Sequence, residues 1–599
     1  MGFDRLLKIV TIVLLAAVAY LLFTLIQAVD RARSATLRAR PETPAAAERV
    51  SASVPTESAG RFANAEYFVP GAPVGGELAG VISSDPPGLN PLLANEASAQ
   101  SVFSLCSLTL AERDWAHPEK FLPALAERWE MSEDKKVFRV FLRRGVMWHS
   151  FIDPESGAAV PAKEVTAADV KFAVDVILDP NVNCAAIRSY YSDLERVEVV
   201  GDYELVFRWK KRYYGSLSAT LELFPLPRHF YCPDGRKFDG RKFNDDYVRN
   251  RVIVGCGPYR FTTWERARRI TLARNDDYVG GRFGAAPPLA GRSFEIVKLP
   301  QTQFQSLLAG RIGMLGLTPE QWTLRTGRPE FRSGRIRKLR YPGSGYSYIG
   351  YNERKPCFAD AATRRALTML IDREAILKKI MFDCGKVAKG PFSPGSVYTD
   401  PALRPHPYDP EGAKRLLAEA GWRDTDGDGI LERNGEKFSF TMLQISGSST
   451  QMKVLPMVQH YFAAAGIDMK LQVVEWSVLL ERLKNRDFEA CNLGWTGSID
   501  PDPYQIFHSS QTEGDGDNFV SFRCAELDAL IVELRGEFDL DRRIALCRKI
   551  ERILHREQPY TFMFYPDVLL AVDARYRNVR VFPDGVRPLS FYRQAEAPR

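Results

Sequence analysis

The chain has 599 residues, 45% of them apolar and 26% charged, which are proportions typical of globular proteins. This length exceeds what a single hydrophobic core organises, so we expect two or three domains. The formal charge of +7 is a slight excess of 81 basic over 74 acidic residues, and the densest basic runs, Arg266–Arg269 and Arg332–Lys338, are short. A nucleic-acid-binding protein concentrates basic residues in a stripe with interleaved aromatic side chains, so no nucleic-acid partner is expected.

The N-terminus carries an apolar segment of 18 residues, Ile9 to Ile26. At about 1.5 Å per residue it would span roughly 27 Å as a helix, close to the thickness of a bilayer core. No small-x-small cleavage motif follows it, and the first cysteine is Cys106, which excludes a lipoprotein start. We therefore predict a transmembrane helix, an uncleaved signal anchor, within residues 1–30; a cleaved signal peptide is the alternative.

The charges beside this segment favour the opposite orientation from the one we expect. Arginines are more frequent just after the segment than basic residues are before it, which by the positive-inside rule places the following chain in the cytoplasm. Long domains translocate despite such a bias, so we still expect an extracytoplasmic body. Residues 31–75 are rich in Pro, Ala, Ser, Glu and Gly without periodicity, which predicts a flexible linker.

Beyond the linker, short β-forming runs alternate with amphipathic helical patterns. Residues 137–142 and 204–209 are predicted strands, and Thr166 with Asp169 begins a predicted helix. In the second half, we expect a helix from Asp360 to about Ile380. The strands at 438–443 and 470–474 lie between helices. The other helices are predicted at 410–421, where Asp409 and Pro410 mark the start, and at 527–534 and 541–555. This alternation predicts an α/β fold with parallel strand pairing.

Several motifs, spread over hundreds of residues, consist of aromatic residues, glycines and prolines and contain no reaction centre. Read in chain order, they resemble the extracellular solute-binding proteins that serve peptide ABC importers, the family 5 type, over about Gly76 to Tyr592. The motifs that carry the resemblance are Gly88–Leu92, Leu122–Glu130, Phe141–His149, Val165–Val170, Gly255–Tyr259, Arg274–Tyr278, Tyr351–Asn352, Phe358–Asp360, Arg364–Leu367, Ile371–Arg373 and Gly494–Gly497 followed by Asp500–Pro503.

The resemblance implies a two-lobed periplasmic-binding-protein-like fold with an extra subdomain. Lobe I is expected at 76–340, with the subdomain inserted at about 116–220. Lobe II is expected at 341–559, and residues 560–599 return to lobe I. A ligand would lie between the lobes and be enclosed when they close.

Trp495 is the first candidate for a ligand contact, because the resemblance implies that this tryptophan forms a wall of the cleft. Gly494 beside it would let the backbone approach a ligand closely. In peptide-binding members, an aspartate three residues after the tryptophan neutralises the ammonium of the ligand. Here that position is Ser498, so either a nearby acid, Asp500 or Asp502, replaces it or the ligand has no free ammonium there.

Four further residues are weaker candidates for ligand contacts, and for each of them a structural role is the alternative. Asn518 follows a Gly-Asp turn, and Tyr565 lies near the second crossing between the lobes. Asn95 and Glu96 come just after the first motif. An Asp-Pro turn is likewise the alternative for Asp500 and Asp502.

Asp424–Gly429 resembles the first half of a calcium loop, but Gly435 stands where the bidentate glutamate belongs, so an Asp-Gly turn is favoured. The nine cysteines contain no Cys-x-x-Cys pair, and their pairing is not readable from spacing. There is no nucleophile elbow, zinc-protease motif, P-loop or dinucleotide fingerprint, so we predict neither an enzyme nor a cofactor or metal.

These expectations converge on an extracytoplasmic solute-binding component of an ABC importer. Its partners would be a peptide or peptide-like solute, a permease, and the membrane through the N-terminal helix. It would lie at the periplasmic face of the cell membrane, or free in the periplasm if the segment is cleaved. The alternatives are a membrane-anchored ligand-sensing receptor, the binding of an oligosaccharide or metal complex, and a secreted hydrolase.

Overall fold

The structure is a computed structural model that describes residues 60–94, 96–244, 248–448, 450–497, 499–514 and 516–594, and these residues belong to one compact unit. The predicted anchor at 1–30 and the predicted linker from 31 to 59 lie outside them. Within the described residues, no helix is long and apolar enough to cross a membrane.

The end of the predicted linker is part of the folded body. Phe62 and Phe68 are only 2% and 7% exposed, and the Phe62 ring stacks on Phe283 with 5.6 Å between ring centroids. Burying such side chains removes a large apolar area from water. The prediction of a flexible linker is therefore wrong for residues 62–68, because their aromatic side chains belong to the core.

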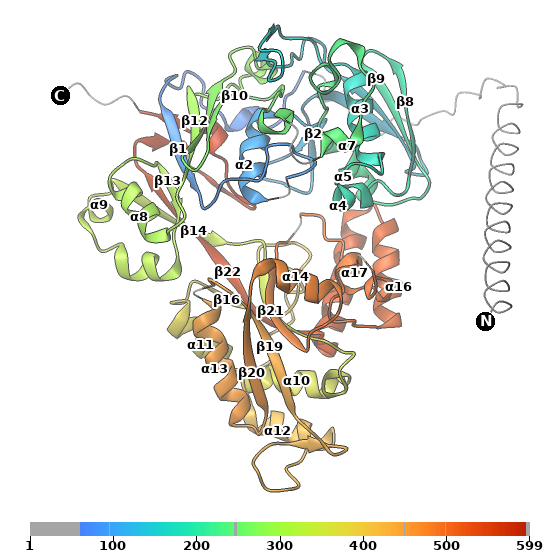
Figure 1. The fold of residues 1–599 in the computed structure, drawn as a ribbon, viewed down its shortest axis with the longest axis vertical. Coiled ribbons are helices and arrows are strands. Elements are labelled where there is room, and N and C mark those ends of the chain that lie inside the picture. The colour runs from blue at the N-terminus through green and yellow to red at the C-terminus, as the bar shows by residue number, and fades with distance from the viewer. Residues whose placement is uncertain are drawn as a thin grey trace, which may run out of the picture. The chain divides into compact units, whose positions relative to one another are not determined.

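The first lobe is built on a four-stranded sheet in the order β1-β12-β11-β10 (Figure 1). Strands β1 and β12 are parallel, whereas β11 is antiparallel to both of its neighbours. The elements of this part are β1 Glu77–Ile82, α2 Ala97–Cys106, β2 Ala111–Arg113, β3 Phe121–Pro123, β10 Tyr259–Glu265, β11 Arg269–Arg274, β12 Gly291–Ile296, α8 Pro300–Leu308 and α9 Pro329–Arg332.

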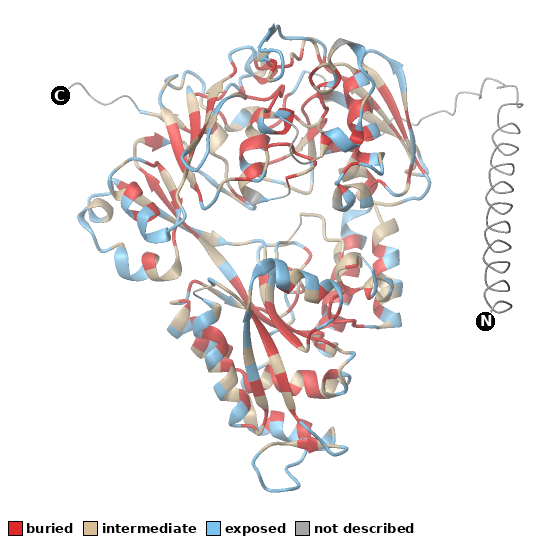
Figure 2. Ribbon diagram, in the orientation of Figure 1, coloured by how far each residue is buried: buried red, intermediate tan, exposed pale blue. Residues whose placement is uncertain are grey.

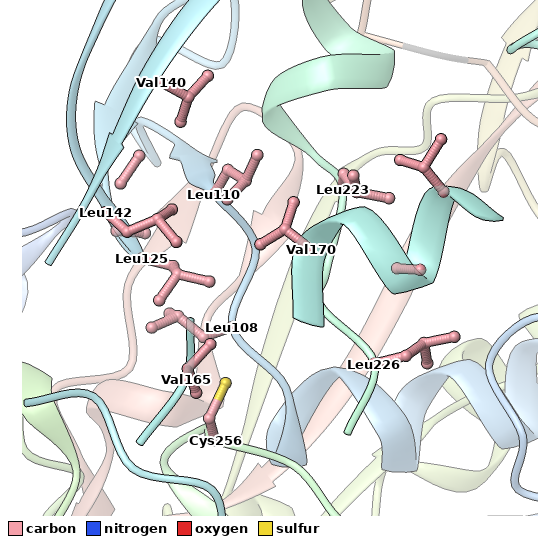
Figure 3. Packing of buried hydrophobic residues seen from close by; sticks show 14 of the residues in the cluster. Leu108, Leu110, Leu125, Val140, Leu142, Val165, Val170, Leu223, Leu226 and Cys256 are labelled. Atoms are coloured by element: carbon pink, nitrogen blue, oxygen red, sulfur yellow. The ribbon is translucent and has the colours of Figure 1, made fainter. Parts of the chain in front are cut away.

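A second, antiparallel sheet in the order β4-β5-β9-β8 comes from the chain between β3 and β10. Its strands β5 and β9 have the predicted bounds, and α3 begins where predicted, because Thr166 and Asp169 form a capping box. The main core of the first lobe lies between α3 and this sheet (Figure 3). The elements are β4 Ala126–Met131, β5 Val137–Leu142, β6 Phe151–Ile152, β7 Ala159–Val160, α3 Ala167–Leu178, α4 Ala185–Ser189, β8 Leu194–Gly201, β9 Glu204–Trp209, α5 Gly215–Leu221, α6 Arg228–Tyr231 and α7 Gly240–Phe243.

A third sheet, of eight strands with the main path β13-β22-β15-β21-β19-β20, extends through both lobes and forms the centre of the second lobe. Strand β19 pairs in parallel with both β20 and β21, which confirms the predicted parallel pairing. Buried and exposed stretches alternate along the helices that cover the sheet (Figure 2). The strands are β13 Met314–Gly316, β14 Ile336–Pro342, β15 Tyr346–Tyr351, β16 Gly385–Val387, β19 Ser439–Ile445, β20 Asp468–Val474, β21 Ala490–Trp495 and β22 Tyr560–Asp573.

Helices cover both faces of this sheet, and adjacent strand residues belong to different cores. Ile349 of β15 packs with α10 to α13, whereas Tyr348 packs with α14, α16 and α17. The helices are α10 Ala361–Leu370, α11 Arg373–Ile380, α12 Pro410–Glu419, α13 Gln451–Ala463, α14 Trp476–Lys484, α15 Tyr504–Phe507, α16 Ala525–Gly536 and α17 Leu540–Glu557. Three short strand pairs complete the described chain: β17 Glu432–Arg433 with β18 Glu436–Lys437, β23 Tyr576–Arg577 with β26 Tyr592–Arg593, and β24 Val581–Phe582 with β25 Gly585–Val586.

One long predicted helix is in fact two. The single helix expected from Asp360 to about Ile380 is interrupted at Ile371 and Asp372, which separate α10 from α11. The carboxylate of Asp372 accepts a hydrogen bond from the backbone N–H of Ala375 at 2.8 Å and so caps the second helix. The helical spacing of apolar residues continues across Ile371 and Asp372 and therefore hid the break. The N-cap residue Asp372 was the signal that a second helix begins.

The long strand β22 joins the two lobes. As far as Pro566 it pairs with β15 and β16, and from Asp567 onward it pairs with β14 and β13. We use this change of partner to divide the described body: the first lobe ends with β14 and resumes at Asp567, and the second lobe lies between. Because one continuous strand serves both lobes, a small change in its backbone near Pro566 would move one lobe against the other.

His149, at the end of the motif Phe141–His149, is a buried neutral side chain. It is 4% exposed, and its Nε2 lies 3.0 Å from the carbonyl oxygen of Gly257, which only accepts hydrogen bonds. Nε2 therefore carries the proton. Burial lowers the pKa of His149 from 6.5 to about 4, so the ring stays neutral at physiological pH.

We expect the stability of the protein to fall between pH 7 and pH 5. Because the pKa of His149 is lower in the folded state, unfolded chains bind more protons as the pH falls below about 6.5, and stability is lost toward pH 4. His149→Gln keeps an amide donor toward Gly257 without a titrating ring. Melting temperatures between pH 5 and 8 should show a shallower slope for this variant than for the wild type, and equal slopes would contradict the assignment.

None of the nine cysteines forms a disulfide, and all nine lie in the described part of the chain. Cys357 and Cys524 are half-buried, and the other cysteines are buried. They pack as small apolar side chains.

Candidate functional site

Trp495 lies at the end of β21, in the second lobe. Its ring stacks on those of Tyr348 and Phe519, with centroids 6.4 and 6.1 Å apart. Strands β19, β20 and β21 run in the same direction, so their carboxyl ends meet at one edge of the sheet. This is the edge at which α/β sheets usually bind ligands, and Trp495 is fixed there by two neighbouring rings.

A cavity of about 700 Å³ opens next to Trp495, between the two lobes. Its walls are mainly apolar and aromatic, which is typical of ligand pockets. Among the described residues that line it there is no histidine, cysteine or lysine. The first lobe contributes Pro91, Leu92, Gln100, Arg113, Ile177, Ile187, Tyr190, Tyr191, Tyr213, Tyr214, Gly215, Ser218, Ala219, Glu222, Leu223 and Phe224, and the second contributes Trp495, Thr496, Ile499, Asp500, Pro501, Asp502, Gln505, Ile506, Asp517, Leu534, Arg535 and Arg543.

Asp500 lies in this wall and is bound by cationic and hydroxyl groups from both lobes. Its Oδ2 is 2.6 Å from Nη2 of Arg113 and 3.3 Å from the hydroxyl of Ser218, both in the first lobe. Its Oδ1 is 3.4 Å from Nη2 of Arg543, in the second lobe. Burial lowers the pKa of Arg113, but Asp500 and Glu222 outweigh it, and the net shift is upward.

Asp502 is held in the same way. The hydroxyl of Tyr213 donates to its Oδ2 at 2.8 Å, and Nε of Arg535 lies 3.0 Å from the same oxygen. Burial and the charge of Asp502 both raise the pKa of Tyr213. The phenol therefore remains a donor at every physiological pH.

The predicted residues around Trp495 have different surroundings. Gly494 is exposed on β21, where it pairs with Ser347. Ser498 and Asn95 lie outside the described residues. Glu96 is exposed and precedes the first turn of α2; it does not line the cavity itself, although its carbonyl accepts a hydrogen bond at 3.1 Å from the N–H of Gln100, which does.

Asn518 and Tyr565 are not placed as predicted. Asn518 is 0% exposed, and its side chain bonds to the backbone of Phe522, donating at 2.8 Å and accepting at 3.1 Å, so it closes a turn. Tyr565 is 3% exposed, and its hydroxyl donates to the carbonyl of Gly390 at 2.8 Å. The polar groups of both side chains form hydrogen bonds with the protein backbone, and neither side chain lines the cavity. The predictions of ligand contacts at these two positions are corrected accordingly.

Sequence reasoning missed the charged and aromatic groups that face Asp500 and Asp502. Arg113, Tyr213 and Tyr214 are hundreds of residues away in the chain, and Arg535 and Arg543 lie on helices α16 and α17. The only local sign was the run Arg212-Tyr213-Tyr214-Gly215, which has no motif of its own. Only the tertiary structure brings these side chains close to Asp500 and Asp502.

A second tryptophan at the same sheet edge was also missed. Trp476 begins α14, directly after β20, and is 50% exposed. Since β20 and β21 are parallel, Trp476 and Trp495 lie at the same end of their strands. Trp476 is not among the residues that line the cavity.

The acidic loop Asp424–Gly429 is neutralised in part by the side chain of Lys437. Asp424, Asp426, Asp428 and Glu432 lie close enough together to hold a metal ion. The Nζ of Lys437, however, contacts Asp428 and lies 3.1 Å from Asp426, and hydrogen bonds to these two carboxylates raise the pKa of Lys437. The ammonium group supplies the positive charge that an ion would bring.

The chain is similar to known proteins over most of its length. It is 30% identical to the oligopeptide-binding protein AppA of Bacillus subtilis over 85% of this chain and 90% of the relative. It is 26% identical to di/tripeptide-binding protein 2 of Pseudomonas aeruginosa over 78% of this chain and 86% of the relative. Among solved structures, AppA of Bacillus subtilis in complex with a nonapeptide matches with a TM-score of 0.72 and 28% identity, over 88% of this chain and all of that one.

These likenesses establish the two-lobed periplasmic-binding-protein-like fold expected from the sequence. In addition, residues 120–518 match the family described as bacterial extracellular solute-binding proteins, family 5 Middle. The match thus covers the antiparallel sheet, the second lobe as far as Asn518, and Trp495 with most of the residues that line its cavity. The chain belongs to the bacterial extracellular solute-binding proteins of family 5.

Proposed function

We propose that this protein captures peptides outside the cytoplasm and delivers them to an ABC importer. The observation that carries the proposal is the cavity of about 700 Å³ between two lobes that share the strand β22. This volume suits a small solute, since ligand pockets usually measure about 300–1,000 Å³. The relatives named above bind oligopeptides and di- or tripeptides, which supports a peptide ligand here.

The mechanism would be capture and closure. In the open form, solvent fills the space between the lobes; a ligand that contacts both lobes prefers the closed form and shifts the population toward it. The ring of Trp495 offers an apolar face, and Thr496, Gln505 and Gln100 offer hydroxyl and amide groups around the cavity. A permease would then reopen the lobes and release the ligand.

The proposed location of the protein at the outer face of the cell membrane is based on the sequence. The apolar segment from Ile9 to Ile26 supports an anchor that keeps the body at the extracytoplasmic face of the cell membrane. The lobe bounds and the inserted subdomain at about 116–220 are likewise proposals: the change of partners along β22 supports bounds at Pro342 and Asp567 in place of the expected 340 and 559, and the antiparallel sheet supports the subdomain. Separating membrane and soluble fractions of wild type and of a chain lacking residues 1–30 tests the anchor: only the wild type should sediment with membranes.

Thermal unfolding with a peptide library tests the ligand. We expect at least one class of peptides to raise the melting temperature, by mass action on the folded state. Native mass spectrometry of the purified protein would identify whatever solute remains bound. If sugars or metal complexes stabilise the protein and no peptide does, the ligand is not a peptide.

A further inference from the structure

Two acids that were candidates for holding a ligand are instead bound by groups from across the cavity. Asp500 and Asp502 follow β21 in the second lobe. Arg113 and Tyr213, which bind them at 2.6 and 2.8 Å, belong to the first lobe. Each carboxylate therefore links the two lobes directly.

The second lobe completes both sites with arginines of its own. Arg543 lies 3.4 Å from Asp500, and Arg535 lies 3.0 Å from Asp502. The Asp500 and Arg113 side chains are 12% and 11% exposed, so water and salt screen their attraction little. Arg113 also binds Glu222 of its own lobe at 2.6 Å, which fixes the guanidinium in position.

Backbone and aromatic contacts surround these ion pairs. The N–H of Tyr214 donates to the carbonyl of Arg535 at 2.7 Å, a main-chain hydrogen bond between the lobes. The ring of Tyr214 covers the guanidinium of Arg543, whose central carbon is 3.2 Å from the ring centroid, and meets Phe538 edge-on at 5.4 Å. The segment from Tyr213 to Ser218 thus lies against the end of α16 and the start of α17.

We propose that Asp500 and Asp502 fasten the two lobes together in the closed arrangement and do not hold a charged end of the ligand. Asp500 already has three positively charged or hydroxyl partners and Asp502 has two, in each case from both lobes, so a ligand ammonium would have to displace an arginine. Arg113 is then a positioning residue for closure. One consequence rests on the proposed function: a free N-terminal ammonium group on a bound peptide contributes little to the affinity.

Hydrogen–deuterium exchange of the ligand-free full-length protein tests the fastening directly. The Tyr214 amide is protected only while the lobes are together, so it reports closure. In Asp500→Asn, which keeps the size of the side chain and removes its charge, we expect this amide to exchange at least about tenfold faster, because the buried guanidinium of Arg113 loses its charged partner in the other lobe. Arg113→Gln should act in the same direction.

Two controls distinguish separation of the lobes from a general loss of stability. The Leu142 amide, which donates to Tyr203 at 2.8 Å within the first lobe, should keep its exchange rate in both variants. Arg139→Gln removes a surface ion pair to Glu204 inside that lobe and should leave Tyr214 unchanged. Unchanged exchange of Tyr214 in Asp500→Asn would overturn the proposal, and so would equal acceleration at Leu142, which would reveal a general stability role.

Binding of matched free and N-acetylated peptides tests the consequence for the ligand. We expect the two affinities to agree within about threefold, since no desolvated charge pair to the ammonium is formed. A strong preference for the free peptide that disappears in Asp500→Asn would overturn the proposal. If neither peptide binds, the proposed function fails, whereas the exchange result in ligand-free protein still decides whether the acids fasten the lobes.

Discussion

Trp495→Ala is expected to weaken ligand binding by about 10- to 100-fold. The ring forms a wall of the cavity at the carboxyl edge of the sheet, and burying a large aromatic side chain against a ligand usually contributes about 1.5–3 kcal/mol. Each 1.4 kcal/mol corresponds to about a factor of ten in affinity. Isothermal titration calorimetry with the ligand found by mass spectrometry would measure the loss.

Two further variants test whether the loss of affinity is specific to the ring of Trp495. Trp495→Phe keeps an aromatic face between Tyr348 and Phe519 and should recover most of the affinity. Trp264→Ala removes a half-buried tryptophan from β10, where its indole N–H donates to Asp85 at 2.8 Å, and should not change binding. Wild-type affinity in Trp495→Ala would show that the ligand does not use this wall.

Arg364→Met is expected to lower the free energy of unfolding by about 3–5 kcal/mol, the usual cost of breaking a buried ionic network. Arg364 is 2% exposed, and it donates to the carbonyls of Phe358 and Ala359 at 2.7 and 3.0 Å. It also donates at 3.0 Å to the carbonyl of Glu557, at the end of α17, and lies 3.2 Å from Glu353. Methionine fills similar space but leaves these acceptors and the acid without a partner.

Chemical denaturation of Arg364→Met, followed by circular dichroism, would measure the loss. Arg415→Met, on the exposed face of α12, is the matched control and should change stability little. Because α17 leads directly into β22, Arg364→Met should also loosen the second lobe near the crossing strand. A loss no larger than that of Arg415→Met would contradict the role assigned to this network.

The local structure of the chain could be predicted where short patterns decide it. Strands β5 and β9 follow from runs of β-forming residues, and α3 and α12 follow from their caps, Thr166 with Asp169 and Asp409 with Pro410. These signals depend on backbone preferences over a few residues and survive folding. Where periodicity alone was used, as from α10 to α11, the break at Asp372 was missed.

The candidate site could be predicted only in part. Trp495 was found through a motif and does line the cavity, because strand ends at one sheet edge place it there. Asn518 and Tyr565 looked equally suitable, yet their polar groups bond to the backbone of their own lobe. A sequence does not show whether a buried polar group has an internal partner, since that partner is chosen by packing.

The sequence by itself determined the family, the α/β alternation and the motif around Trp495, because each is written in residues close together in the chain. The tertiary structure alone decided what Asp500 and Asp502 face. Their partners Arg113 and Tyr213 come from remote parts of the chain, and only the folded lobes bring opposite charges within hydrogen-bonding distance. Charge attraction of this kind depends on separation and burial in space, and neither is encoded in the spacing of residues along the chain.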